Sequence, residues 1–303
     1  MMIPPTLKPG DTIGIVSTAR KITEEELQPF ISLMKEWELK PIFGKSIGAS
    51  ENQFAGNDAL RTQDFQEMLD NPAIKAIWCA RGGYGTVRII DGLDLSNFRK
   101  NPKWVIGYSD MTVLHNMLHN CGIASLHAQI AFNMEQKTEA TRSSIYNVLF
   151  GKAHTIEYSP KGNLNRLGEA KGALVGGNLS VLYSLLGSAS AVETKGKILF
   201  LEDLDEYLYH IDRMMQNLKR NGLLSELKGL IIGGMSDMND NIIPFGKTAE
   251  EIIWDAVKEY EYPVCFYFPA GHIEDNRALV MGQDAELSVS AKTVTLSFRR
   301  RHD

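Results

Sequence analysis

Along the first half of the chain, short apolar runs typical of strands alternate with segments in which apolar residues recur at helical spacing. Short apolar runs at 12–16, 73–80 and 103–106 are typical of buried strands, and the segment 58–69 has the pattern of a helix. Thr23 and Glu26 form a capping box at the start of another helix, which runs towards Trp37. Because strands alternate with helices, the pattern predicts a Rossmann-like α/β fold, a parallel sheet covered by helices.

The second half has strands and helices in mixed order. A polar segment at 159–166 separates it from a helix expected at 138–149, and Gly176-Gly177-Asn178 is expected to open a helix that ends near Leu186. Leu208, Ile211, Met215 and Leu218 keep helical spacing and so predict a helix with one apolar stripe. Strands are expected at 172–175, 197–201, 229–232, 264–268, 285–289 and 293–298.

Length and composition limit the classes of protein. A chain of 303 residues exceeds what one hydrophobic core usually serves, so we expect an N-terminal α/β domain over 1–155 and a C-terminal α/β domain over 156–303. The formal charge of −5 leaves no basic field for nucleic acid, and the basic run at 299–301 is a short terminal one. No apolar run is long enough for a membrane span, and the first residues lack a secretory pattern.

The three cysteines are Cys79, Cys121 and Cys265. They are odd in number, far apart and set among apolar neighbours, so we expect buried free thiols rather than disulfides or metal ligands. A reducing, cytoplasmic setting fits this pattern.

Two successive predicted strands end in polar turns. Arg81-Gly82-Gly83-Tyr84-Gly85 follows the first strand and leads into a helix expected through Val87, Ile89 and Ile90, and Gly107-Tyr108-Ser109-Asp110 follows the second. The carboxyl ends of parallel strands meet at one edge of the sheet, where ligands bind in open α/β folds. The sequence therefore predicts a binding or active site at this edge.

The tight turn at Ser109 suits a nucleophile, because it would expose the hydroxyl beside the N–H groups of a helix start. A serine at that place is also a common helix N-cap, so the motif alone leaves both roles open. The glycines at 82–85 allow backbone N–H groups to approach a ligand, either as an oxyanion hole or as an anion-binding nest.

Two further strand ends carry ionisable groups. Leu201-Glu202-Asp203 closes an apolar strand with two carboxylates, and Gly271-His272 follows another strand. Taken singly, the first motif favours an ordinary strand boundary, and the second favours a structural histidine. His115 and His119 have the four-residue spacing of a metal pair, but Asn116 stands where a metalloprotease helix has glutamate, so we expect no metal site.

Taken together and in order, these motifs resemble the LD-carboxypeptidase family, the muramoyltetrapeptide carboxypeptidases or serine peptidases of family S66. The resemblance extends from Leu7-Lys8-Pro9-Gly10-Asp11 to Gly271-His272 and includes Gly176-Gly177-Asn178-Leu179. It implies an N-terminal domain with the nucleophile and a C-terminal mixed α/β domain, with its own β-structure, that carries the glutamate and histidine.

The resemblance implies a role for each matching residue. Ser109 is similar to the nucleophile, His272 to the general base and acid, and Glu202 to the carboxylate that orients the histidine. The backbone N–H of Asp110, with that of Gly82 or Gly83, corresponds to the oxyanion hole. Arg81 and Asn178 fall in segments that border the site, and we expect substrate contacts from them. A cation is expected near the pocket to recognise the free carboxylate of the substrate, and Arg81 is the candidate for it.

The implied reaction is hydrolysis of an L,D-peptide bond that releases a terminal D-alanine from a murein tetrapeptide during cell-wall recycling. The resemblance implies no metal or organic cofactor, a cytoplasmic small-peptide hydrolase and a homodimer. A rival hypothesis is a self-immunity peptidase that cleaves peptidyl or aminoacyl nucleotide antibiotics of the microcin C kind. A noncatalytic anion-binding protein, with Ser109 as a cap, is the alternative outside enzymes.

Overall fold

The computed structural model describes residues 1–298, and its first sheet is built from strands that are apolar at almost every position. Such strands suit a parallel sheet with both faces covered. The six strands lie in the order β11-β5-β4-β3-β1-β2, and all neighbours are parallel except the antiparallel pair β11 and β5. Their bounds are β1 (Thr12–Val16), β2 (Lys40–Phe43), β3 (Ile74–Cys79), β4 (Trp104–Gly107), β5 (Ser125–His127) and β11 (Leu279–Met281).

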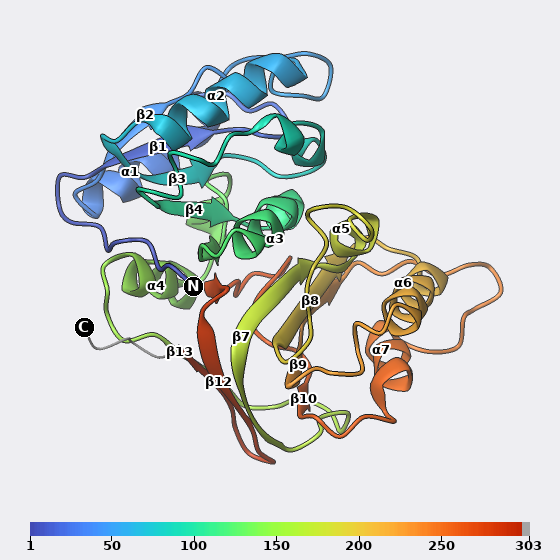
Figure 1. Ribbon diagram of the computed structural model, residues 1–303. Coiled ribbons are helices and arrows are strands. Elements are labelled where there is room, and N and C mark those ends of the chain that lie inside the picture. The colour runs from blue at the N-terminus through green and yellow to red at the C-terminus, as the bar shows by residue number, and fades with distance from the viewer. Residues whose placement is uncertain (299–303) are drawn as a thin grey trace.

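Helices cover both faces of this sheet and form two apolar cores. The core with α1 (Gln28–Glu36) and α4 (Glu139–Leu149) includes Phe30 and Trp78, and the core with α2 (Asp58–Asp70) and α3 (Thr112–Asn120) includes Phe65 and Val105. In Figure 1 these helices enclose the upper sheet. The carboxyl ends of β3 and β4 are thereby held firmly where the two polar turns begin.

The second sheet is half parallel and half antiparallel. Its order is β10-β9-β8-β7-β12-β13-β6, with parallel pairing from β10 to β7 and antiparallel pairing from β7 to β6. The strands are β6 (Thr155–Tyr158), β7 (Gly168–Asn178), β8 (Ile198–Leu204), β9 (Gly229–Ser236), β10 (Val264–Cys265), β12 (Asp284–Val289) and β13 (Val294–Phe298). Its helices are α5 (Leu179–Ser184), α6 (Leu208–Arg220) and α7 (Ala249–Val257), which lie together on the right of Figure 1.

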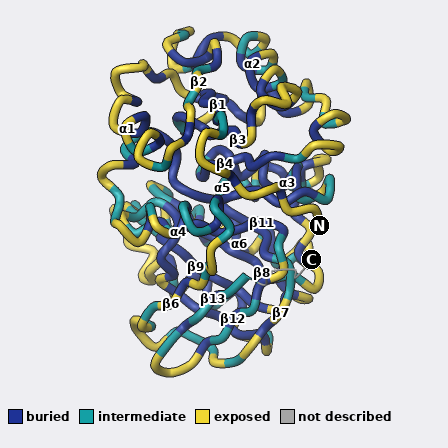
Figure 2. Tube along the Cα trace, turned by 90° about the vertical axis from the view of Figure 1, so that its left-hand side faces the viewer, coloured by how far each residue is buried: buried dark blue, intermediate teal, exposed yellow. Residues whose placement is uncertain are grey.

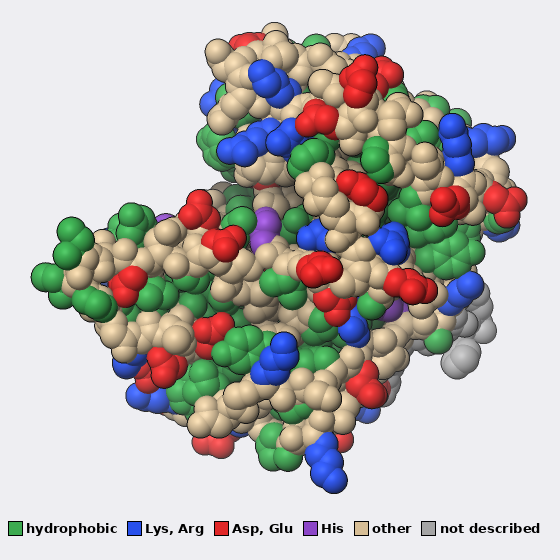
Figure 3. All heavy atoms as spheres, turned by 180° about the vertical axis from the view of Figure 1, so that it is seen from behind, with side chains coloured by type: hydrophobic (Ala, Val, Ile, Leu, Met, Phe, Trp, Pro, Cys, Tyr) green, Lys and Arg blue, Asp and Glu red, His purple; other side chains and the backbone are tan. Residues whose placement is uncertain are grey.

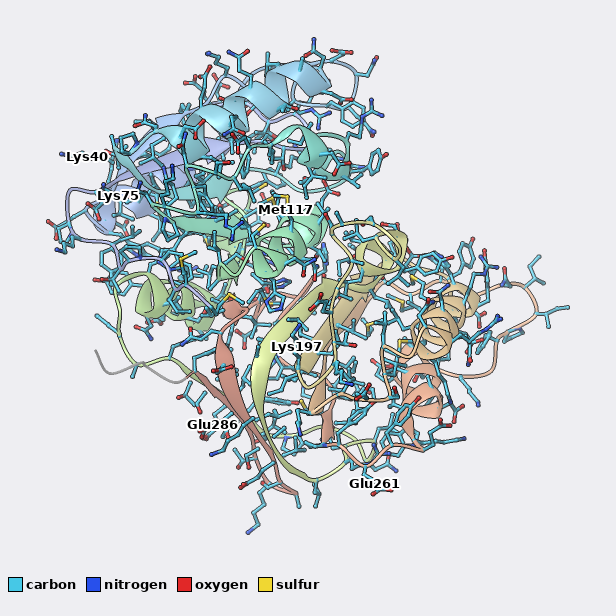
Figure 4. All side chains as sticks on the ribbon, viewed as in Figure 1. Lys40, Lys75, Met117, Lys197, Glu261 and Glu286 are labelled. Carbon is cyan, nitrogen blue, oxygen red and sulfur yellow. The ribbon has the colours of Figure 1, made fainter. Side chains whose placement is uncertain are left out.

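The two sheets are joined by packing as well as by the chain. Helix α3 lies against β7, and the backbone N–H of Asn178 donates to Thr112 Oγ1 at 3.0 Å. Gly177 makes this approach possible, because a Cβ there would lie 2.5 Å from Thr112 Oγ1. Side chains fill the space between α3 and the lower sheet in Figure 4, and Figure 2 shows buried chain running continuously between the two parts. The turn that begins at Ser109 is therefore anchored on the second sheet.

The predicted fold class is confirmed: a parallel Rossmann-like sheet is followed by a mixed α/β part with its own sheet. The predicted helix through Val87, Ile89 and Ile90 is wrong, because this segment forms two short 3-10 turns, Thr86–Arg88 and Ile90–Gly92. The turns begin after Gly85 at φ 149° and end at Gly92, and these glycines disfavour a longer helix.

Other boundaries differ by a few residues. Gly176 and Gly177 still belong to β7, and Asn178 is the N-cap of α5, its side chain accepting from the N–H of Val181. The capping box of Thr23 and Glu26 is present, with both hydrogen bonds made, and leads through a 3-10 turn, Glu25–Leu27, into α1. Two further 3-10 turns are Ser109–Met111 and Met134–Gln136.

Within residues 1–298 no helix combines the length and apolar character needed to cross a bilayer. The basic run at 299–301 lies outside the described residues. Cys79 and Cys265 are buried free thiols as predicted, whereas the free thiol Cys121 is only partly buried.

The contact of β7 with β8 yields a stability prediction. Gly176 has φ 123°, and a Cβ there would collide with the backbone carbonyl of Phe200. We expect Gly176→Ala to lower the free energy of unfolding by roughly 3 kcal/mol or more, measured by urea denaturation. Gly187→Ala is the matched control, since Gly187 has φ 86° and nothing within 4 Å of its would-be Cβ, so only a backbone cost of about 1 kcal/mol is expected. Equal losses in the two variants would contradict the steric explanation.

Candidate active site

Ser109 lies at the carboxyl end of β4 with a strained backbone. Its φ is 65°, in the left-handed region that serine rarely adopts. Such strain costs on the order of 1–3 kcal/mol and is found mainly where function requires it. Within residues 1–298 the Ser109 hydroxyl has no hydrogen-bond partner.

The structure excludes the capping role considered for Ser109. The N-cap residues of the 3-10 turn Ser109–Met111 and of α3 are Tyr108 and Met111, and neither end has a side-chain cap. The left-handed conformation of Ser109 therefore has no explanation in helix capping.

The glycine turn after β3 lies directly against Ser109. A Cβ on Gly82 would be 3.3 Å from Ser109 Cβ and 3.5 Å from its Oγ, so the backbone there is in close contact with the hydroxyl. Among the described residues, the N–H groups of Gly82, Gly83 and Asp110 donate to no acceptor. Three backbone donors in the glycine and serine turns thus have no acceptor among the described residues.

Asp110 ties the two turns together. Its carboxylate accepts from the N–H of Thr86 at 2.7 Å, and burial raises its pKa against the opposing effect of that hydrogen bond. From the other side, the buried Arg61 donates through Nη1 to the carbonyl of Gly85 at 3.0 Å. These contacts fix the position of the glycine turn relative to Ser109.

Glu202 and His272 form a hydrogen-bonded pair at the edge of the second sheet. Glu202, near the end of β8, is fully buried, and its Oε2 accepts from His272 Nδ1 at 2.7 Å and from the backbone N–H of His272 at 3.1 Å. Because a carboxylate can only accept, Nδ1 carries the proton and Nε2 is left as the free nitrogen. Gly271 has φ 108°, and a Cβ there would lie 2.8 Å from Glu202 Oε2, so only glycine admits this contact.

The pKa of His272 reflects two opposing influences. Burial acts to lower it, but the charge and hydrogen bond of Glu202, together with the charge of Asp203, outweigh burial and raise the pKa above its usual value. An imidazole whose protonated form is stabilised in this way can take up a proton readily.

Asp203, next to Glu202, has a structural position. Its carboxylate accepts from Asn178 Nδ2 and from the backbone N–H of Ser180, each at 2.9 Å, so it joins β8 to the start of α5. Burial, and then the negative charge of Glu202, raise the pKa of Asp203 to about 7. Asn178 is itself buried and its side chain is engaged in these contacts; a substrate contact from Asn178 stays a prediction.

The side chain of Tyr108, in the serine turn, contacts His272 in the loop after β10. Its ring centroid is 4.7 Å from that of His272, and both residues line a cavity of about 470 Å³. The loop after β5 and the loop after β10 form the rest of the wall, which comprises Gln129, Ile130, Phe132, Asn133, Gln136, Lys137, Ile273 and Glu274. Figure 3 shows a recess between the two parts of the molecule with a histidine side chain within it.

Residues of this wall were not found from the sequence. β5 has only three residues, too short for a periodic signal, and Gln129 and Lys137 follow it in a loop without a recognisable motif. Tyr108 does lie in the serine motif, but its contact with His272 depends on the packing of the two sheets.

Ser109 and His272 make no direct hydrogen bond within residues 1–298. Hydrogen bonds between a nucleophile and its base are often long in ligand-free enzymes and shorten when substrate binds.

Arg81 lies beside the cavity rather than in its wall. Its guanidinium carbon is 4.5 Å from the ring centroid of Phe132, and its Nη1 lies 3.4 Å from Glu26 Oε1. A substrate contact from Arg81 stays a prediction.

His115 has both ring nitrogens engaged, with Ser125 Oγ at 2.7 Å and the carbonyl of Gly107 at 2.9 Å. Residues 1–298 contain no group of three or more His, Cys, Asp or Glu side chains placed to hold a metal ion.

Comparison with known proteins assigns a family to both parts of the chain. Residues 13–128 match the model of the LD-carboxypeptidase N-terminal domain, and residues 171–287 match that of the LD-carboxypeptidase C-terminal domain. A probable murein peptide carboxypeptidase of Bacillus subtilis is 34% identical over 97% of this chain and 93% of its own length.

A solved structure supports the same family assignment. The crystal structure of muramoyltetrapeptide carboxypeptidase from Oxalobacter formigenes superposes with a TM-score of 0.87 at 26% identity, covering 96% of this chain and all of the other. The microcin C7 self-immunity protein of Escherichia coli is a more distant relative, 24% identical over 95% of this chain and 93% of its own length.

The hydrogen bond of Glu202 makes a prediction about titration. In the wild type, the pKa of His272 followed by NMR is expected above the ordinary value of about 6.5. In Glu202→Gln the charge is removed while burial remains, so the pKa of His272 should fall below that value. His154, whose pKa is lowered chiefly by burial, serves as the internal control and should not change. An unaltered pKa of His272 in the variant would contradict the role given to Glu202.

Proposed function

This chain belongs to the LD-carboxypeptidase family, and we propose that it is a serine peptidase that releases a terminal D-amino acid from murein tetrapeptides. The observation that carries the proposal is the buried Glu202–His272 hydrogen bond of 2.7 Å. His272 lines a cavity together with Tyr108, the residue before the strained Ser109. The hydroxyl, imidazole and carboxylate come from three distant segments, and each has the environment that its role requires.

In the proposed reaction Ser109 Oγ attacks the carbonyl of the L,D-peptide bond. His272 takes the serine proton on Nε2 and later gives it to the leaving nitrogen of the D-amino acid. Glu202 fixes the tautomer with Nδ1 protonated and stabilises the imidazolium that forms. The acyl-enzyme is then hydrolysed by water, which His272 activates in the same way.

The tetrahedral oxyanion is placed against the free backbone donors. The N–H of Asp110 and that of Gly82 or Gly83 are the proposed oxyanion hole, supported by their lack of other acceptors and by the contact of Gly82 with Ser109. By analogy with measured cases, loss of one such donor costs roughly 3 kcal/mol of transition-state stabilisation.

The proposal includes a cytoplasmic role in cell-wall recycling, which free thiols fit. It includes no metal or organic cofactor. Assembly as a homodimer stays a prediction.

The antibiotic-immunity reaction is the second candidate, because the microcin C7 self-immunity protein is among the relatives. Murein peptides are favoured by the higher identity to the probable murein peptide carboxypeptidase, 34% against 24%. The cavity also offers little for a nucleotide base to stack on, since the Tyr108 ring packs against His272 and Arg81 covers Phe132.

Ser109→Ala tests the nucleophile. Release of D-alanine from a defined tetrapeptide should fall by about four orders of magnitude or more, as in dissected triads. Alanine tolerates the left-handed backbone no worse than serine, so the thermal unfolding midpoint should be unchanged. Ser225→Ala, on the exposed turn after α6, is the control and should retain full activity. Retained D-alanine release by Ser109→Ala would exclude Ser109 as the nucleophile, whereas a wild type that releases no D-alanine would favour the noncatalytic anion-binding alternative.

A substrate comparison separates the two candidate reactions. The kcat/KM for a murein tetrapeptide is expected to exceed that for an aminoacyl sulfamoyl adenylate at least about tenfold, because the aromatic rings of the cavity are already occupied. Both substrates are assayed at equal enzyme concentration by chromatography of the products. The reverse preference would assign the chain to the immunity reaction.

A further inference from the structure

The wall of the cavity beside His272 contains a cation, Lys137, that takes no part in the proposed bond cleavage. Lys137 lines it together with His272 and Tyr108, and it follows the 3-10 turn Met134–Gln136 in the loop after β5. Its Nζ donates to the carbonyl of Ile273 at 2.7 Å, which places the ammonium group one residue from His272.

The direction of the reaction decides which part of the substrate enters this cavity. In the proposed function, His272 must deliver its proton to the leaving nitrogen, so the leaving D-amino acid has to lie against the imidazole. The free carboxylate of that amino acid is only two bonds from the same nitrogen. A group that binds the carboxylate must therefore lie in the wall that contains His272.

Lys137 has the charge and the free donors for that task. An ammonium group has three N–H donors, and only one of them is used within residues 1–298. No described carboxylate lies within ion-pair distance of its Nζ. Burial lowers the pKa of Lys137, against a weaker opposing effect of Glu274. A partly buried cation with no carboxylate at ion-pair distance is unfavourable, and a bound carboxylate would reduce that cost.

The other cations near the site are placed differently. Arg81 packs on Phe132 and is paired with Glu26. The exposed side chain of Arg20 lies beside Gly83, where a Cβ would be 2.7 Å from its Cδ, and so sits on the glycine turn. Neither residue lines the cavity with His272.

We propose that Lys137 is the residue that selects a free terminal carboxylate, binding it by an ion pair as the D-amino acid leaves. This inference rests on the proposed function, and it explains why the enzyme would act as a carboxypeptidase instead of cleaving within a peptide. Lys137 is a specificity residue, and the proposed bond cleavage is carried out by Ser109, His272 and Glu202 with the oxyanion-hole N–H groups.

The test compares two substrates that differ in one group, a tetrapeptide with a free terminal D-alanine and the same peptide ending in D-alaninamide. The wild type is expected to prefer the free acid about 10- to 100-fold in kcat/KM, mainly through KM, as for a hydrogen bond to a charged group. Lys137→Met should lose that preference by slowing only the free acid, and Lys137→Arg should keep most of it. Lys137→Gln, which retains a donor for the carbonyl of Ile273, should behave as Lys137→Met does.

Lys100→Met, at an exposed site, is the matched control and should keep the preference. Equal losses on acid and amide in Lys137→Met and Lys137→Gln would show a purely structural role and overturn the proposal. An acid preference that survives in these variants but disappears in Arg81→Met or Arg20→Met would overturn it in favour of the arginine. If the wild type releases neither D-alanine from the free acid nor D-alaninamide from the amide, the proposed function itself fails, and the two failures are thus distinguishable.

Discussion

The hydrogen bond between Glu202 and His272 is the interaction on which the candidate site depends. A fully buried carboxylate is costly unless it is compensated, and here the imidazole and the backbone N–H of His272 both donate to Oε2, while Oε1 has no hydrogen-bond partner among the described residues. The contact requires Gly271, because any side chain at that position would meet Glu202. The chain between β10 and β11 is therefore held against the end of β8, and the free face of the imidazole points to the cavity.

The position of Ser109 relative to His272 must also be fixed, because Ser109 follows a strand of the first sheet and His272 a strand of the second. Helix α3 is fastened to β7 through Thr112 and Asn178, and Gly177 allows the close approach. In addition, β11, which comes from the second half of the sequence, pairs with β5 in the first sheet. Two separate attachments thus fix the serine turn relative to the histidine, which matters since small errors of position reduce rates strongly.

Neighbouring acids at the end of β8 have different tasks because their side chains face different partners. Glu202 meets the imidazole, whereas Asp203 holds Asn178 and the first turn of α5. The negative charges are coupled: Glu202 contributes to the raised pKa of Asp203, and Asp203 contributes to the raised pKa of His272. The strand end is in this way both a structural junction and part of the candidate site.

The sequence alone determined the alternation of strands and helices in the first sheet, the glycine and serine turns at its edge, and the order of motifs that identified the family. Local periodicity and turn chemistry carry that information over a few residues. Tertiary structure alone decided that Ser109 does not cap a helix, that 86–92 forms 3-10 turns, and that Tyr108 meets His272. The short strands β5 and β11 and the position of Lys137 also escaped prediction, because they depend on contacts between segments more than a hundred residues apart, which no local pattern records.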